Sequence, residues 1–91
     1  MTSLIKIFGS KAQTKLVQHL LEHKGRIYNQ IGLSRRLNLS PSTVARVIIP
    51  LIEEGIIKYD QISGQMKIIA LNVENEKVNA LIDFYDKLSE K

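Results

Sequence analysis

The stretch SPSTVARVIIPLIEEG, which ends at Gly55, constrains the fold more than any other part of the chain. Ser40 is a favourable helix N-cap, and Pro41 suits the first helical position, where its missing N–H has no intrahelical partner to lose. Apolar residues then recur at i, i+3, i+4 and i+7, which places on one face Val44, Val47, Ile48 and Leu51. Glycine commonly follows the last helical turn. The pattern predicts a helix over about residues 41–54 with one buried face.

The opposite face of this helix is polar and presents Ser42, Thr43 and Arg46. Ile49 lies near the same face, and two roles are open for it: packing on an earlier helix, which we favour, and contact with a thymine methyl group. Pro50 removes the hydrogen bond to the Arg46 carbonyl and crowds that turn, at a cost of roughly 3 kcal/mol in a regular helix. We therefore expect a kink in the turn before Pro50, or a break that restarts the helix there.

A first helix is predicted over about Lys11–His23. Ser10 and Gln13 form the S-x-x-Q pattern of a capping box, and Gly25 follows the last turn. The face that this helix would bury is an apolar stripe of Leu16, Val17, Leu20 and Leu21.

A second helix is predicted over about Gln30–Leu37, after a short extended segment at Arg26–Tyr28. Asn29 can cap this helix, and Asn38 tolerates the left-handed conformation that a sharp turn needs. Leu39 would then pack under the turn. The residues expected to face inward are Ile31, Leu33 and Leu37.

The chain after Gly55 changes from helical to alternating patterns. The runs IIKYDQI and QMKIIAL are joined by Ser63-Gly64, which is typical of a β-hairpin over about residues 57–71. A terminal helix is predicted over about Glu74–Leu88, with a heptad-like stripe of Val78, Leu81, Ile82, Tyr85 and Leu88. We expect one small α+β domain, mostly α, with a three-helix core, a hairpin and a C-terminal helix.

Charge is distributed unevenly along the chain. Residues 1–50 contain eight Lys or Arg and one acid, whereas residues 51–91 contain five and eight, so the halves carry +7 and −3 and sum to +4. This split suggests that one face meets a polyanion. Cysteine is absent, which excludes disulfides and thiolate metal sites. No apolar run suits a membrane span and the N-terminus has no signal-peptide pattern, so we expect an intracellular, cytoplasmic protein with no membrane partner.

The segment LSRRLNLSPSTVARVIIPLIEEGIIKYDQISGQMKIIAL resembles the winged helix-turn-helix transcription regulators of the MarR/ArsR-like kind, common in archaea and their viruses. IFGSKAQTKLVQHLLEH is similar to the first helix of small archaeal members. The resemblance covers about residues 7–72. It implies a DNA-binding domain over residues 1–72, with residues 73–91 as a C-terminal dimerisation helix of the same compact unit. The implied function is sequence-specific binding of double-stranded DNA, with the third helix in the major groove and the hairpin as the wing.

The resemblance also implies which residues meet DNA. The third helix would contribute Ser40, Ser42, Thr43 and Arg46. The preceding helix would offer phosphate contacts from Arg35 and Arg36. The wing would contribute Lys58, Gln61, Ser63, Gly64, Gln65 and Lys67. The chemistry agrees, because an arginine can bind guanine O6 and N7 bidentately and a helix N-terminus attracts phosphate.

Plainer roles stay open for several of these side chains. Ser42 and Thr43 are also suited to capping the first helical turn. Arg46 has Glu53 and Glu54 as candidate ion-pair partners on its own helix, although neither spacing makes a direct neighbour pair. The two arginines of the second helix would equally serve as a solvated surface.

The stripe of the terminal helix would be an exposed apolar patch on a monomer. We therefore expect it to pair with the same helix of a second chain, and the alternative is that it folds back on its own domain. A two-fold dimer would place two recognition helices on successive major-groove turns. We expect a repressor that occupies an operator. No cofactor, metal or small-molecule effector is indicated.

Other function classes fit less well. An enzyme is not indicated, because no nucleophile, phosphate loop or carboxylate pair stands in a recognisable motif. His19 and His23 are spaced i, i+4, but no third metal ligand is evident and a solvated face is favoured. Binding of RNA or single-stranded DNA is weakened by the presence of only five aromatic residues. The main alternative is a winged-helix protein-interaction module, which would need no basic residues before and within the third helix.

Overall fold

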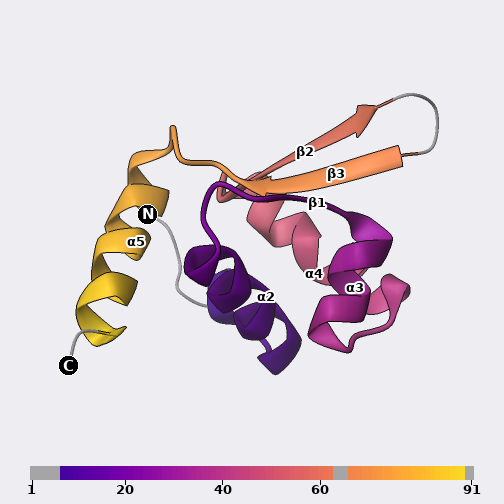
Figure 1. The fold of residues 1–91 in the computed structure, drawn as a ribbon, viewed down its shortest axis with the longest axis horizontal. Coiled ribbons are helices and arrows are strands. Elements are labelled where there is room, and N and C mark those ends of the chain that lie inside the picture. The colour runs from indigo at the N-terminus through magenta and orange to yellow at the C-terminus, as the bar shows by residue number, and fades with distance from the viewer. Residues whose placement is uncertain (1–6, 63–65, 90–91) are drawn as a thin grey trace.

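The computed structural model describes residues 7–62 and 66–89. In chain order its elements are α2 (Lys11–Glu22), β1 (Ile27–Asn29), α3 (Gln30–Leu37), α4 (Pro41–Glu53), β2 (Ile57–Ile62), β3 (Met66–Leu71) and α5 (Glu76–Ser89). Three helices, α2, α3 and α4, pack on one side of a small sheet, and α5 lies at one end of the long axis (Figure 1). The α+β fold with a helical core and a hairpin is therefore confirmed.

Each of the first three helices begins at the side-chain cap that the sequence predicts. The capping oxygens accept hydrogen bonds from backbone N–H groups three residues later: Ser10 Oγ from Gln13 at 3.1 Å, Asn29 Oδ1 from Gly32 at 2.6 Å and Ser40 Oγ from Thr43 at 3.1 Å. Each cap satisfies an N–H that has no partner within its helix. Because these signals are local, the predicted bounds of the three helices hold to within one residue.

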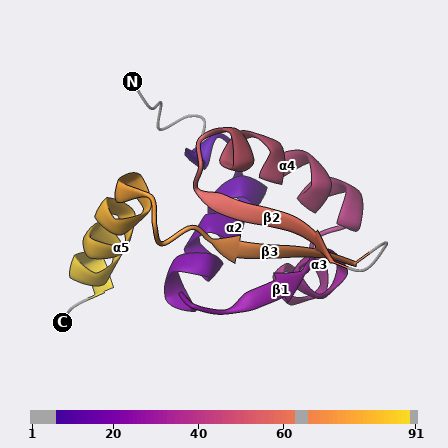
Figure 2. The same ribbon diagram turned by 90° about the horizontal axis from the view of Figure 1, so that it is seen from above.

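The sheet is antiparallel, with strand order β1-β3-β2. Its central row joins Tyr28, Ile69 and Tyr59 across the three strands, and these residues point toward the helices. The predicted alternation in the hairpin is confirmed, because Ile57 is buried and Lys58 is exposed. The opposite face of the sheet lies open above the helices (Figure 2).

The core is built from the predicted stripes of α2 and α4 together with the inner face of the sheet. Its largest fully buried side chains are Leu16, Leu20, Leu33, Leu51, Ile56 and Ile69. The prediction for Ile31 is wrong, since this side chain is 56% exposed. At 100° per residue, Ile31 lies about 200° from Leu33 around the helix, so one face cannot bury both. The position that is buried instead is Ser34, whose hydroxyl donates to the Ile31 carbonyl at 2.7 Å.

Two asparagines join the end of α4 to the start of α5. Asn75 Nδ2 donates to the Gly55 carbonyl at 2.8 Å and to the Glu54 carbonyl at 3.3 Å, and Asn72 Nδ2 donates to Gly55 at 3.1 Å. Asn75 Oδ1 also accepts from the Lys77 N–H at 2.9 Å, in the first turn of α5. These bonds give carbonyls at the C-terminus of α4 the partners that the helix itself does not supply. No pattern in the sequence predicted this junction.

Candidate nucleic-acid interface

The turn between α3 and α4 is tight because Asn38 adopts the left-handed conformation, with φ 56° and ψ 44°. The Leu39 N–H donates to the Ser34 carbonyl at 2.9 Å, and the Leu39 side chain is half-buried against the core. The predicted turn is therefore confirmed. It fixes the start of α4 relative to α3.

Three hydroxyl groups meet at the exposed N-terminus of α4. Ser40 Oγ lies 3.2 Å from Ser42 Oγ and 2.8 Å from Thr43 Oγ1, in addition to accepting the Thr43 N–H. Ser40 is thus the helix cap. Ser42 and Thr43 present hydroxyls beside it, where the free N–H groups and the dipole of the helix favour an anion.

An outer stripe of α4, made of Ser42, Arg46 and Ile49, points away from the core. All three are exposed and lie opposite the buried residues of the helix. Among the described residues Arg46 has no ion-pair partner, and Glu54 pairs instead with Lys77 at 3.6 Å. The favoured packing role for Ile49 is wrong, because its side chain is 54% exposed. The expected break at Pro50 is absent, since α4 continues to Glu53.

Arg35 and Arg36 are both exposed in the last turn of α3. The Arg36 guanidinium lies 5.8 Å from the centroid of the Tyr28 ring, a cation–π distance that orients it over β1. Both arginines therefore lie in the helical turn that directly precedes the α3–α4 connection.

The structure separates the two lysines of the wing. Lys67 is exposed and pairs with Gln61 near the end of the hairpin that lies beside α3 (Figure 2). Lys58 stands at the other end, where its Nζ lies 2.5 Å from Glu74 Oε1. About four residues, or about 13 Å, separate Lys58 from the end of β2. Ser63, Gly64 and Gln65 lie outside the described residues, and of Gln61 only the backbone is described.

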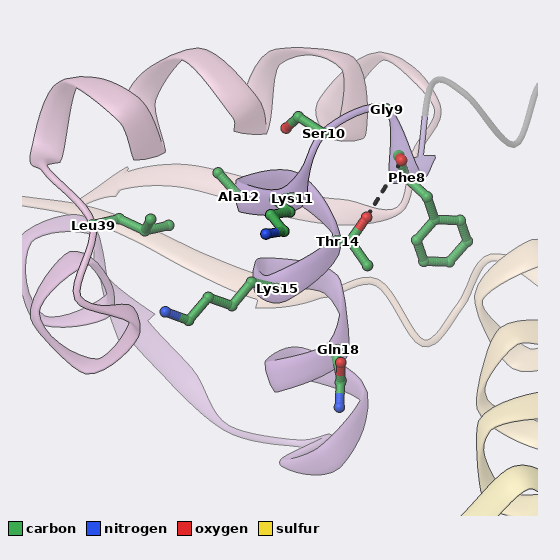
Figure 3. A pocket seen from close by; sticks show the side chains of 9 residues that line it. All are labelled: Phe8, Gly9, Ser10, Lys11, Ala12, Thr14, Lys15, Gln18 and Leu39. Atoms are coloured by element: carbon green, nitrogen blue, oxygen red, sulfur yellow. Dashed lines mark hydrogen bonds between the residues drawn. The ribbon is translucent and has the colours of Figure 1, made fainter.

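A concave surface beside α2 brings two more cations to the same region. Its volume is about 830 Å³, and its lining includes Lys11, Lys15 and Leu39. Lys15 extends toward the turn that carries Leu39, while Thr14 Oγ1 donates to the Phe8 carbonyl at 3.3 Å (Figure 3). Both lysines belong to the basic N-terminal half of the chain, but no local pattern in the sequence places them near the turn.

The residues expected at a dimer interface divide into two groups. Val78 is fully buried in this chain's own core, and Leu81, Ile82 and Tyr85 are half-buried against it. Leu88 is 68% exposed, as is Phe84 at 62%. Phe84 was missed, although its spacing of three and four residues from Leu81 and Leu88 marks it as part of the same face. A groove of about 390 Å³ lies between α2 and α5, and its lining includes Leu81, Phe84, Tyr85 and Leu88 from α5 and Thr14, Gln18 and Leu21 from α2.

The His19 and His23 rings are in tilted contact, with centroids 4.5 Å apart, and the Tyr28 ring centroid lies 5.5 Å from that of His19. Burial lowers the pKa of His19, and the neighbouring His23 and Arg36 lower it further. His19 is half-buried, so of the pair only His23 lies on the solvated face.

Within residues 7–62 and 66–89, no group of three His, Asp or Glu side chains could hold a metal ion. No helix in those ranges is long and apolar enough to cross a membrane.

Comparison with known families gives a match over the region just described. Residues 13–58 match the model of a family described as winged helix-turn-helix DNA-binding. The matched range runs from α2 through α3, the turn and α4 to the start of β2. The family is one of DNA-binding domains rather than of enzymes. No curated protein matches the sequence.

Solved structures share the fold at low identity. Reduced HlyU from Vibrio cholerae superposes with a TM-score of 0.73 at 22% identity, over 97% of this chain and 86% of that one. A possible transcriptional regulator from Methanosarcina mazei superposes with a TM-score of 0.69 at 23% identity, over 86% of this chain and 68% of that one. MepR from Staphylococcus aureus, in a structure of its DNA complex, superposes with a TM-score of 0.65 at 19% identity, over 89% of this chain and 68% of that one. At these identities the likeness shows a common fold.

Proposed function

The chain belongs to the winged helix-turn-helix DNA-binding family, and from that premise we propose that it is a sequence-specific transcription regulator. In this proposal α4 enters the major groove and the β2–β3 hairpin lies along the neighbouring backbone. The protein acts in the cytoplasm as a repressor that occupies an operator. It needs no cofactor and has no catalytic role. The regulators among the structural relatives support the proposal at the level of the fold.

The observation that best supports it is the state of Arg46. Its guanidinium is exposed on the outer stripe of α4 and has no ion-pair partner among the described residues. An arginine in this position is free to bind O6 and N7 of guanine. Arg35 and Arg36 lie in the last turn of α3, and Lys11 and Lys15 line the concave surface that reaches Leu39. Positive charge on both sides of the α3–α4 turn suits phosphate contacts that position the helix.

The test is fluorescence anisotropy of duplex DNA across a salt series, with wild type, Arg46→Ala and Lys87→Ala. The control removes the same charge from the last turn of α5, far from α4. We expect affinity to fall steeply with salt and Arg46→Ala to lose about tenfold to hundredfold on a preferred sequence. Lys87→Ala should stay within about twofold. Folded wild-type protein that fails to bind duplex DNA at low salt would refute the proposal and favour a protein-interaction module.

We further propose a homodimer that pairs through α5, with Leu81, Ile82, Tyr85, Leu88 and the newly identified Phe84 at the contact. The exposure of Phe84 and Leu88 supports the dimer, because in a monomer these two side chains would leave an apolar patch in water. Val78 is left out, since its side chain does not reach the surface.

Molecular mass in solution tests the dimer. Leu88→Asp should shift the protein toward monomer. Val73→Asp, a control that adds the same charge at a 49% exposed apolar residue outside the stripe, should not. A monomeric wild type at high concentration would exclude the dimer.

A further inference from the structure

Ile49 is the large apolar side chain on an otherwise polar outer stripe. It is 54% exposed, three residues after Arg46 and seven after Ser42, so the three side chains lie along one line of the helix surface. It is absent from the half-buried residues that pack on the core. Single exposed apolar residues are common and need no explanation by themselves. Here the position is informative, because it coincides with the face that would meet the bases.

The major groove offers one apolar group to such a side chain. Its edges present hydrogen-bond donors and acceptors, and thymine adds a C5-methyl group. We infer that Ile49 contacts the C5-methyl group of a thymine next to the base pair read by Arg46. This inference rests on the proposed function and adds to it one element of the operator sequence.

The spacing along α4 places the methyl group. At a rise of about 1.5 Å per residue, Ile49 lies about 4.5 Å along the axis from Arg46, which corresponds to one or two base pairs at about 3.4 Å each. Glu53 follows on the same side and is exposed. A carboxylate next to phosphates is unfavourable, so the stripe leaves the groove after Ile49.

A neighbouring residue provides a matched control. Ile52 is 38% exposed on the same helix. It follows Ile49 by three residues and is rotated about 60° around the axis, away from the stripe. Truncation of either isoleucine to alanine removes the same atoms from a partly exposed side chain, and circular dichroism checks that both variants keep the fold.

The test replaces single thymines by uracil, which removes the methyl group and leaves every hydrogen-bonding atom in place. The probe is the duplex that the wild-type protein selects from a random library. We expect each single uracil substitution at the position that Ile49 contacts to weaken wild-type binding about fourfold, the effect of one buried methyl group. Ile49→Ala should bind the thymine duplex about as weakly as the wild type binds the uracil duplex, and its own binding should not change when uracil replaces thymine at that position. Ile52→Ala should keep the wild-type sensitivity.

The outcomes separate this inference from the function on which it depends. If no thymine is methyl-sensitive, or if Ile49→Ala keeps the same sensitivity, the inference is wrong while DNA binding stands. If the folded protein selects no duplex, the proposed function fails first. The same position carrying 5-methylcytosine paired with guanine tests the source of the methyl group. Tighter binding to methylcytosine than to thymine would overturn the assignment to thymine.

Discussion

Replacement of Asn75 by alanine tests whether the junction between α4 and α5 stabilises the domain. The substitution removes the Oδ1 cap on α5, which is worth about 1 kcal/mol at such a position. It also removes the Nδ2 donor from the Glu54 and Gly55 carbonyls. Gly55 keeps a donor from Asn72, so the loss is close to one ordinary hydrogen bond, about 1 kcal/mol. We expect the free energy of unfolding to fall by about 2 kcal/mol.

Urea denaturation followed by circular dichroism measures this change, at one fixed protein concentration because a dimer would make stability depend on it. In a domain of this size the midpoint of thermal unfolding should fall by about 10 °C. Asn75→Ser keeps a capping oxygen but is too short to reach the two carbonyls, so it should lose about half as much. A change below about 0.5 kcal/mol in the alanine variant would refute the view that Asn75 holds the junction.

Three further predictions follow from individual contacts. Gly55→Ala should destabilise the domain more than Gly25→Ala in urea denaturation, because both glycines have positive φ but only at Gly55 would a Cβ meet another atom, at 2.7 Å. The free energy of unfolding should rise with pH between the lowered pKa of folded His19 and about 6.5, because the unfolded chain binds more protons in that pH range. Urea midpoints measured across this range should vary less with pH in His19→Gln. Lys67→Ala should reduce the slope of log affinity against log salt by about one, whereas Lys58→Ala should leave it unchanged because Lys58 is ion-paired away from the wing end.

Local signals explain why so much of the fold was predictable. A capping side chain, a helix stop and an apolar stripe each depend on neighbours within a few residues, so Ser40 and Gly55 bound α4 correctly without any knowledge of the tertiary structure. The outer stripe of α4 followed from the same periodicity. Its polar members were placed correctly on the exposed face.

Contacts between distant segments explain what was missed. The pairing of β1 with β3 and the bonds from Asn75 to α4 join residues that are far apart in sequence, and no local pattern encodes them. Lys58 shows the same limit. Strand alternation placed it on the hairpin correctly, but its ion pair with Glu74 depends on where the chain goes after the sheet.

The hydrogen bonds at Gly55 hold the end of α4 at a fixed angle to the start of α5. This junction connects the C-terminus of α4 directly to the N-terminus of α5, and the Lys77–Glu54 ion pair spans the same corner. The 13 residues of α4 extend about 20 Å from this pivot, so a rotation of about 5° there would move the start of the helix by about 1.7 Å. In the proposed dimer, where α5 is shared by two chains, the separation of the two α4 helices would depend on this corner. Half-site spacing and base recognition would then be set by different residues, and each could change without the other.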